Sequence, residues 1–153
     1  MTRNQLITEL KNNFNIKELV CPHCYNKFKE NAWQFISTEL LSVLHTLRYV
    51  IFNKPIIINT YHREGRFSQR GLRCNKCNLV KNKTDIYLSA HCLGKAIDFS
   101  VDGVTSEDTR SAIIQNINKF EYPIRLEKDT DGWVHIDVYQ PVNSETNLIE
   151  FYG

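Results

Sequence analysis

Three segments of the chain alternate apolar and polar residues with the two-residue period of a β-strand. They read AIDFSV, IRLE and WVHIDV, so each has one apolar face and one polar face. If the apolar faces share one core, the polar side chains of all three lie together on the opposite side of a single sheet. The chemically versatile side chains on that side are Asp98, Glu127, His135 and Asp137.

The rest of the chain supplies helices and a further strand to pack against these segments. An apolar stripe with spacings of three and four predicts a helix from Asn31 to about Phe52, and TSEDTRSAIIQNINKF predicts another that begins after Thr105. KPIIIN reads as a buried strand, and KDTDG reads as the loop of a β-hairpin between IRLE and WVHIDV. We therefore expect one α+β domain, residues 1–153, with a small, mainly antiparallel sheet packed on helices.

A long stretch without strand or helix signals, residues 60–88, separates the first two strands. A loop of this length in a compact domain is usually functional or otherwise tied down. Residues 62–83 within it carry one acid, Glu64, and a run of basic side chains: Arg63, Arg66, Arg70, Arg73, Lys76, Lys81 and Lys83. Although the whole chain has a formal net charge of only +2, this segment is expected to attract an anionic partner.

The N-terminal sequence MTRNQLITELKNNF has neither the apolar stretch nor the cleavage site of a signal peptide. No apolar run is long enough to cross a bilayer, so a membrane partner is not expected. We therefore expect synthesis in the cytosol. In that reducing compartment, five cysteines are expected to be free thiols or metal ligands rather than disulfides.

Four of the cysteines form two pairs about fifty residues apart, CPHC and CNKC. Two such pairs, Cys21 with Cys24 and Cys74 with Cys77, are typical of a structural zinc site, which would fasten the long basic loop to the N-terminal segment. Two other interpretations remain open: two unrelated thiol pairs, or a mixed site in which His23 replaces one cysteine. The fifth, Cys92, reads as a small packing residue.

The stretch SAHCLGKAIDFS places His91 just ahead of the strand that carries Asp98. Together with His135, these residues offer two imidazoles and one carboxylate, which is a ligand set of catalytic zinc sites that keep a fourth position open. Zinc activates water, and a neighbouring carboxylate can take its proton; Glu127 fits that role by its strand parity. The competing interpretation is that these are ordinary solvated residues on the polar face of a sheet.

Two motifs extend this interpretation. SAHCLGKAIDF matches Ser-x-His-x-x-Gly-x-Ala-x-Asp, and WVHIDV matches Trp-x-His-x-Asp. Together they resemble the zinc D-alanyl-D-alanine carboxypeptidase family, which includes VanY-type enzymes and phage L-alanyl-D-glutamate endopeptidases and shares its fold with the Hedgehog signalling domain. The resemblance covers about residues 36–138 and implies that fold for this chain.

The resemblance also implies roles for individual residues. It implies zinc ligands at His91, Asp98 and His135, and a polar contact to substrate or to a ligand from Ser89. The stretch INTYHREGRFSQRGLR resembles the arginine-bearing stretch upstream of the histidine motif in phage-type members. By that likeness Arg63 would polarise the scissile carbonyl or hold a substrate carboxylate. Arg70, in the same stretch, would bind substrate.

One position departs from the family pattern. Many members carry the catalytic acid three residues before the last ligand, where this chain has Gly132. A hairpin can bring Glu127 back to the same place, whereas Asp129 and Asp131 fall in the predicted turn and are weaker candidates. Asp137 would orient a histidine. As a fourth ligand, it would instead close the site.

The function implied is that of a zinc metallopeptidase that cleaves peptidoglycan stem peptides, either as a carboxypeptidase or as an endopeptidase. Such an enzyme would reach the cell wall through lysis machinery or as part of a phage particle. One alternative is a non-catalytic, zinc-stabilised module whose basic loop, residues 62–83, binds an anionic partner. Nucleic acid is disfavoured as that partner because aromatic residues are not interleaved with the basic ones. Another alternative is a structural phage component without turnover.

Overall fold

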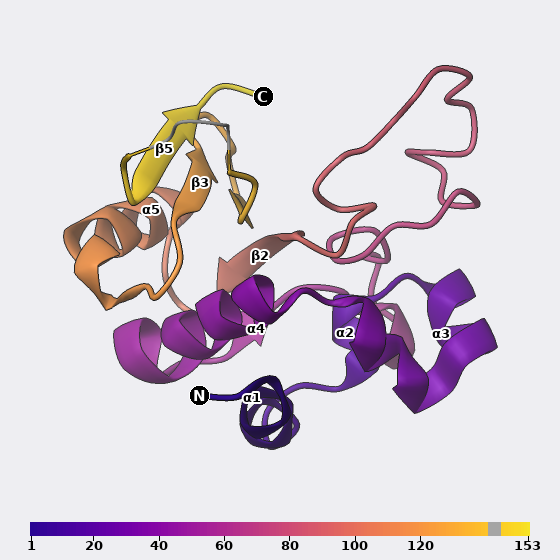
Figure 1. The fold of residues 1–153 in the computed structure, drawn as a ribbon, viewed down its shortest axis with the longest axis horizontal. Coiled ribbons are helices and arrows are strands. Elements are labelled where there is room, and N and C mark those ends of the chain that lie inside the picture. The colour runs from indigo at the N-terminus through magenta and orange to yellow at the C-terminus, as the bar shows by residue number, and fades with distance from the viewer. Residues whose placement is uncertain (141–144) are drawn as a thin grey trace.

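A mixed sheet has its strands in the order β1-β2-β4-β3-β5. Figure 1 labels three of them, β2, β3 and β5. The computed structural model describes residues 1–140 and 145–153. Neighbouring strands are antiparallel except for β3 and β5, which are parallel. The bounds are Ile56–Ile57 for β1, Ala96–Val101 for β2, Ile124–Glu127 for β3, Val134–Asp137 for β4 and Leu148–Phe151 for β5. The predicted α+β class with a mainly antiparallel sheet is confirmed, and β5 is an element that the sequence did not indicate.

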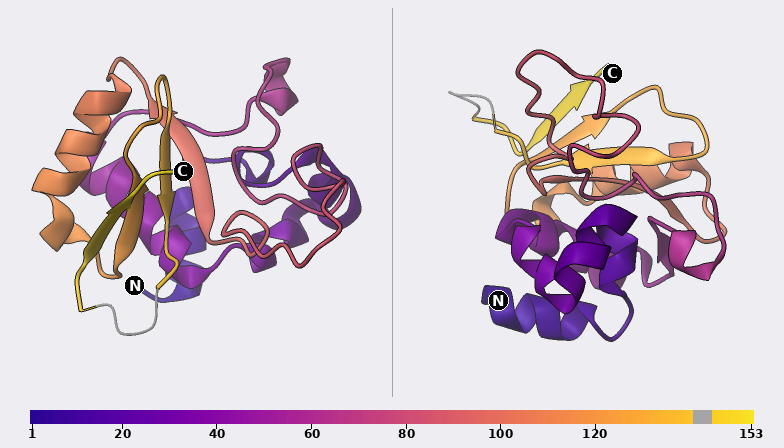
Figure 2. Two further views of the ribbon diagram at one scale, coloured as in Figure 1. Left: turned by 90° about the horizontal axis from the view of Figure 1, so that it is seen from above. Right: turned by 90° about the vertical axis from the view of Figure 1, so that its right-hand side faces the viewer.

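Helices from the first third of the chain lie on one side of the sheet (Figure 2). Their bounds are Arg3–Leu10 for α1, Ile16–Leu19 for α2, Pro22–Phe28 for α3, Lys29–Phe35 for η1, Thr38–His45 for α4 and Thr46–Phe52 for η2. Later in the chain follow η3 at Tyr61–Arg63, α5 at Ser106–Gln115 and η4 at Ile117–Lys119. Thr105 caps α5 as predicted, because its Oγ1 accepts a hydrogen bond from the N–H of Asp108 at 3.1 Å.

The single helix predicted for residues 31–52 is wrong at its start. A 3₁₀ segment, η1, ends at Phe35, and Ile36 and Ser37 are extended. The Ser37 hydroxyl then accepts a hydrogen bond from the N–H of Leu40 at 3.2 Å, which caps a new helix, α4. The apolar period continues across this break because both pieces face the same core, so the period alone did not reveal it.

Gly94 lets the turn before β2 approach that break closely. Its φ is +66°, and a Cβ there would lie 1.8 Å from the carbonyl oxygen of Phe35. The carbonyl oxygen of Gly94 accepts a hydrogen bond from the N–H of Ser37 at 2.9 Å. These contacts require a glycine, which gives a physical reason for the glycine between His91 and Asp98.

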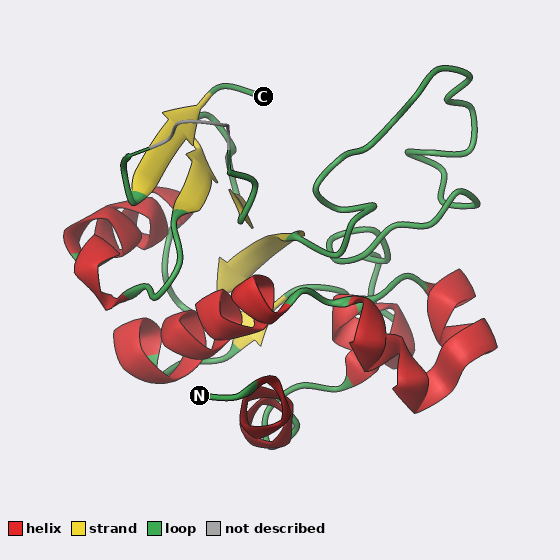
Figure 3. Cartoon of the chain, in the orientation of Figure 1, coloured by secondary structure: helices red, strands yellow, loops and turns green. Residues whose placement is uncertain are grey.

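The apolar faces of the strands form the core, as their alternation predicted. Ile97, Phe99, Ile124, Leu126, Val134 and Ile136 are each at most 1% exposed. The opposite face is not solvated: Asp98 is 6% exposed, His135 9% and Asp137 0%. The long loop between η3 and β2 packs partly over this polar face and partly extends beyond the body of the protein (Figure 3). Burial of the polar face means that each charged group on it needs a partner.

No single helix within the described residues is both long and apolar enough to cross a bilayer. The pair Pro22–Phe35 and Thr38–Phe52 has the length and composition only when the two are taken together, across a bend of 84°.

Candidate metal centres

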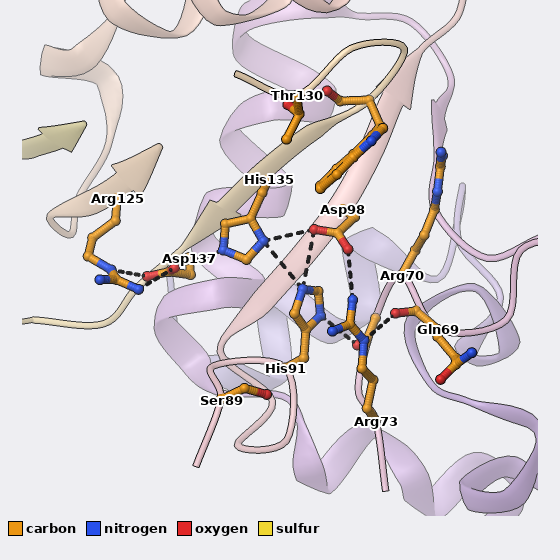
Figure 4. A network of polar contacts seen from close by, with 12 residues as sticks. Gln69, Arg70, Arg73, Ser89, His91, Asp98, Arg125, Thr130, His135 and Asp137 are labelled. Atoms are coloured by element: carbon orange, nitrogen blue, oxygen red, sulfur yellow. Dashed lines mark hydrogen bonds and ion pairs between the residues drawn. The ribbon is translucent and has the colours of Figure 1, made fainter. Parts of the chain in front are cut away.

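Two strands and the turn before one of them bring His91, Asp98 and His135 together (Figure 4). Asp98 on β2 and His135 on β4 are directly paired in the antiparallel register. His91 reaches them from the turn that Gly94 closes. One donor atom from each of the three side chains lies within 4.8 Å of the other two, and all three residues are buried.

Hydrogen bonds to the backbone and to Asp137 fix which nitrogen of each histidine faces the cluster. His91 Nδ1 lies 2.9 Å from the carbonyl oxygen of Gly71, which can only accept, so Nδ1 carries the proton and Nε2 is free. His135 Nε2 lies 2.8 Å from Oδ2 of Asp137, so in the neutral ring Nδ1 is free. These two free nitrogens lie 3.3 Å apart.

Asp98 completes the cluster with one oxygen. Its Oδ1 lies 2.8 Å from Nδ1 of His135 and 3.2 Å from Nε2 of His91. Its Oδ2 accepts a hydrogen bond from Nη2 of Arg73 at 2.9 Å. Burial alone would raise the pKa of Asp98, but hydrogen bonds with His135 and His91 outweigh burial and hold it well below its usual range. Asp98 is therefore an anion at neutral pH.

A short chain of charged groups supports His135 from behind. Arg125 donates from Nε and Nη2 to the two oxygens of Asp137 at 2.8 and 2.9 Å, and Asp137 in turn accepts from His135. Burial alone would lower the pKa of His135, but hydrogen bonds with Asp137 and Asp98 raise it to about 9. Asp137 thus orients the ring, as predicted for one of its two roles, and does not stand in the group of converging donor atoms.

Three lone pairs therefore converge in a buried space: Nε2 of His91, Nδ1 of His135 and Oδ1 of Asp98. Three acceptors at such distances repel one another unless a cation lies between them, and that cation is either a proton on a histidine or a metal ion. Two imidazole nitrogens and one carboxylate oxygen are a donor set that divalent zinc accepts. The three residues predicted as ligands are thus brought together with suitable atoms.

Glu127 lies on the same side of the sheet as His135, in the neighbouring strand β3, as its parity predicted. Its carboxylate is turned toward the end of the chain, since a Cβ on Gly153 would lie 1.9 Å from Oε1 of Glu127. Phe151, opposite Glu127 in β5, places its ring 5.8 Å from that of His135. Within the described residues, no hydrogen bond joins Glu127 to the histidine cluster, and its catalytic role remains a prediction.

The residues predicted to bind substrate lie at different distances from this cluster. Arg70 is near: its Nη1 donates to Oγ of Ser100 at 3.3 Å, and its guanidinium lies 3.4 Å from the ring centre of Phe67. Ser89 closes the turn that contains His91 by two hydrogen bonds with Cys92, each at 3.3 Å.

Arg63 is not brought to the cluster. It is exposed, ends η3 and lines a separate hollow with Asn13, Glu18 and Arg48. The 3₁₀ turn that follows Thr60 directs it there, because the carbonyl oxygen of Thr60 accepts from the N–H groups of Arg63 and Gly65.

Three residues that support the cluster were not singled out for this purpose from the sequence: Gly71, Arg73 and Arg125. Arg125 had a detectable signal, since it is a basic residue on the same strand face as Glu127. Gly71 and Arg73 lie in the long loop, whose path has no period from which a contact could be deduced.

A second group of donor atoms lies where the long loop meets α3. Cys21, His23, Cys74 and Cys77 each place one donor atom within 4.8 Å of the others. Sγ of Cys21 lies 3.7 Å from Sγ of Cys74, and Nδ1 of His23 lies 3.6 and 3.9 Å from Sγ of Cys74 and Cys77. This group of three thiols and one imidazole could hold a metal ion.

His23 takes the position predicted for Cys24, which was the mixed alternative left open from the sequence. The two are successive residues in the first turn of α3, so their side chains point about 100° apart around the helix axis. Cys24 lies next to the group, and its pKa is raised by a hydrogen bond with Cys21 and by burial. A hydrogen bond from Cys24, the largest influence, lowers the pKa of Cys21, which favours a thiolate there.

A scan against protein-family models finds no match, and searches of curated proteins and of solved structures find none either.

Proposed function

We propose that the chain is a zinc metallopeptidase that cleaves peptidoglycan stem peptides, as a carboxypeptidase or an endopeptidase. The observation that carries this proposal is the convergence of the free atoms of His91, Asp98 and His135, each side chain held from behind by a hydrogen bond to Gly71, Arg73 or Asp137. Ligands oriented in this way are typical of catalytic metal sites. Both sequence motifs contribute residues to the same cluster.

A zinc ion held by these three residues would act as a Lewis acid on the scissile carbonyl and lower the pKa of water toward neutrality. Asp137 and Arg125 would keep Nδ1 of His135 directed at the ion. Glu127, on the same side of the sheet, would take a proton from the attacking water and return it to the leaving amine. For this step its carboxylate would turn from Gly153 toward the cluster. Arg70 would bind an acidic group of the peptide.

We further propose that the group Cys21, His23, Cys74 and Cys77 holds a structural zinc ion. Three thiolates and one imidazole close all four positions of a tetrahedral site, which leaves none for substrate. Cys21 directly precedes α3, His23 lies in its first turn, and Cys74 and Cys77 lie in the long loop, so the ion would tie that loop to the helical layer. A loop of this length in a compact domain is usually functional or tied down, and the zinc ion would tie it down.

A binding module is the second candidate. The observation that favours it is a set of exposed basic side chains along the long loop: Arg63, Arg66, Lys76, Lys81 and Lys83. In that case the loop would hold an anionic partner, and the histidine cluster would be a remnant without turnover. Both candidates agree with a protein that reaches the cell wall through lysis machinery or within a phage particle.

Digestion of purified peptidoglycan tests the proposal, with the released fragments identified by mass spectrometry. The zinc-loaded protein should release D-alanine or separate stem peptides at one bond, and His135→Ala should abolish the release. His45→Ala is a matched control, because His45 lies outside the cluster and contacts Glu9. If the loaded protein leaves the stem peptides intact, the peptidase proposal is wrong and the binding module becomes the preferred explanation.

A further inference from the structure

We infer that the backbone segment of residues 70–74, the linking segment, couples the two metal clusters, so that a metal ion in the thiol cluster raises the affinity of the histidine cluster for its own ion. The thiol cluster is Cys21, His23, Cys74 and Cys77, and the histidine cluster is His91, Asp98 and His135. The inference rests on the proposed metal in both clusters. It does not require that the protein be an enzyme.

One edge of the linking segment is fastened to the helical layer. Leu72 accepts from the N–H of Cys21 at 3.0 Å and donates to the carbonyl oxygen of Leu19 at 2.8 Å, which makes a parallel bridge with Val20. A Cβ on Gly71 would lie 2.2 Å from the carbonyl oxygen of Leu19, so the two backbones pass too closely for any other residue. A metal ion bound by both Cys21 and Cys74 would hold the two strands of this bridge together just beyond Val20 and Leu72.

The other edge of the same segment holds the histidine cluster. The carbonyl oxygen of Gly71 accepts from Nδ1 of His91 at 2.9 Å, and the carbonyl oxygen of Arg70 accepts from the N–H of Asp98 at 2.7 Å. The N–H of Arg73 donates to the carbonyl oxygen of His91 at 3.3 Å. The backbone of the linking segment thus fixes the orientation of one imidazole and the position of the carboxylate.

Arg73 is the side chain that joins the two clusters. It directly precedes Cys74 in the chain, and its guanidinium holds Oδ2 of Asp98 at 2.9 Å and the carbonyl oxygen of Gln69 at 2.6 Å. The side chains of Arg73 and Asp98 are 13% and 9% exposed, so this ion pair is screened little by water. Arg73 is therefore a positioning residue: it leaves Oδ1 of Asp98 as the oxygen that faces the two histidines.

This geometry predicts a coupling that is reciprocal. Without metal in the thiol cluster, Cys74 and the segment behind it gain freedom, and ordering them again would reduce the affinity of the histidine cluster. By linkage, an ion in the histidine cluster must raise the affinity of the thiol cluster for its ion by the same factor. Groups that orient metal ligands typically contribute about 10- to 100-fold in affinity.

Cobalt binding to the full-length protein separates the two clusters by spectroscopy. Cobalt bound to thiolates gives intense charge-transfer absorption in the near ultraviolet, whereas cobalt bound only to nitrogen and oxygen gives weak bands in the visible. Titration against a competing chelator then yields one affinity for each cluster. Cys77→Ser, which leaves all three ligands of the histidine cluster intact, should weaken cobalt binding there by about 10- to 100-fold.

Arg73→Gln tests the link without touching a cysteine or a metal ligand, and it remains informative if Cys77→Ser does not fold. It should weaken cobalt binding at the histidine cluster by a similar factor and shift the visible bands, while the thiolate bands persist. Arg73→Lys should restore part of the affinity. Arg66→Gln is the matched control, since Arg66 is exposed and stacks only on Phe67 among the described contacts.

Equal cobalt affinity of the histidine cluster in the wild type and in Cys77→Ser would overturn the inference. So would a loss in Arg73→Gln that Arg66→Gln reproduces. These results are independent of hydrolysis. An active enzyme whose clusters bind metal independently contradicts only the coupling. An inactive protein whose clusters are coupled contradicts only the peptidase proposal.

Discussion

Asp98 and His135 face each other directly across β2 and β4, with Oδ1 of the carboxylate 2.8 Å from Nδ1 of the imidazole. Behind each of them stands an arginine, Arg73 directly behind Asp98 and Arg125 behind His135 through Asp137. The sheet register therefore fixes the positions of the two backbones, and the buried ion pairs fix the orientations of the two side chains. A substitution in the supporting groups should change metal binding even where the ligands are intact.

Asp137→Asn is the first such substitution. It removes the charge behind His135, permits the ring to adopt the other tautomer and leaves Arg125 without its anionic partner. We expect metal affinity at the histidine cluster to fall by about 10- to 100-fold. Titration with a competing chelator measures this, and Asp102→Asn, at an exposed position, is the control. Equal affinities for Asp137→Asn and wild type would contradict the orienting role.

The metal-free protein should lose stability as the pH rises from 6.5 through 9. In the folded protein the pKa of His135 is raised from 6.5 to about 9, so the stabilisation by its protonated form is complete below pH 6.5 and disappears above 9. A shift of this size corresponds to roughly 3 kcal/mol. Urea unfolding in the presence of a chelator measures the decline. His135→Gln should remove most of it, and a decline of the same size in that variant would assign it to other groups.

Glu127→Gln keeps the shape of the side chain but removes the proposed base. We expect zinc content and folding to be unchanged and peptide hydrolysis to slow by roughly 10²- to 10⁴-fold, the usual contribution of a general base. Asp131→Asn, at an exposed position in the hairpin loop, should cost far less. The opposite order of effects would place the acid in the loop. No effect from either would favour a binding module.

The thiol cluster offers a choice between two donors that a metal measurement can decide. We expect Cys74→Ser with Cys77→Ser to remove one metal equivalent and to destabilise the fold strongly, because structural metal binding is coupled to folding. His23→Ala should weaken that site more than Cys24→Ser, since His23 belongs to the converging donors and Cys24 lies beside them. The reverse order would show that the site uses four cysteines.

Strand alternation was sufficient to place Asp98, Glu127 and His135 on one side of a sheet. It works because a slip of one residue would expose a whole apolar face. Alternation did not indicate β5. Its residues, Leu148–Phe151, are only partly buried and pair in parallel with β3. A short strand at the edge of a sheet has a weak alternation signal, so its pairing depends on the tertiary fold.

Contacts made by loops were beyond the reach of the sequence. The approach of Gly71 to Leu19 and the reach of Arg73 to Asp98 depend on where the helical layer lies, which no local pattern encodes. The presence of His23 in the thiol cluster, in place of the predicted Cys24, has a similar cause. The spacing of CPHC identifies the motif, but the turn of α3 that begins at Pro22 decides which side chain faces the other thiols.

Anomalous scattering from crystals of the zinc-loaded protein shows whether both clusters hold a metal ion. We expect two zinc peaks per chain. One should lie between Nε2 of His91, Oδ1 of Asp98 and Nδ1 of His135, at about 2.0 to 2.2 Å from each. The other should lie within the thiol cluster. A peak at the thiol cluster alone, with His91, Asp98 and His135 hydrogen-bonded to one another around a proton, would show that the histidine cluster is not a zinc site.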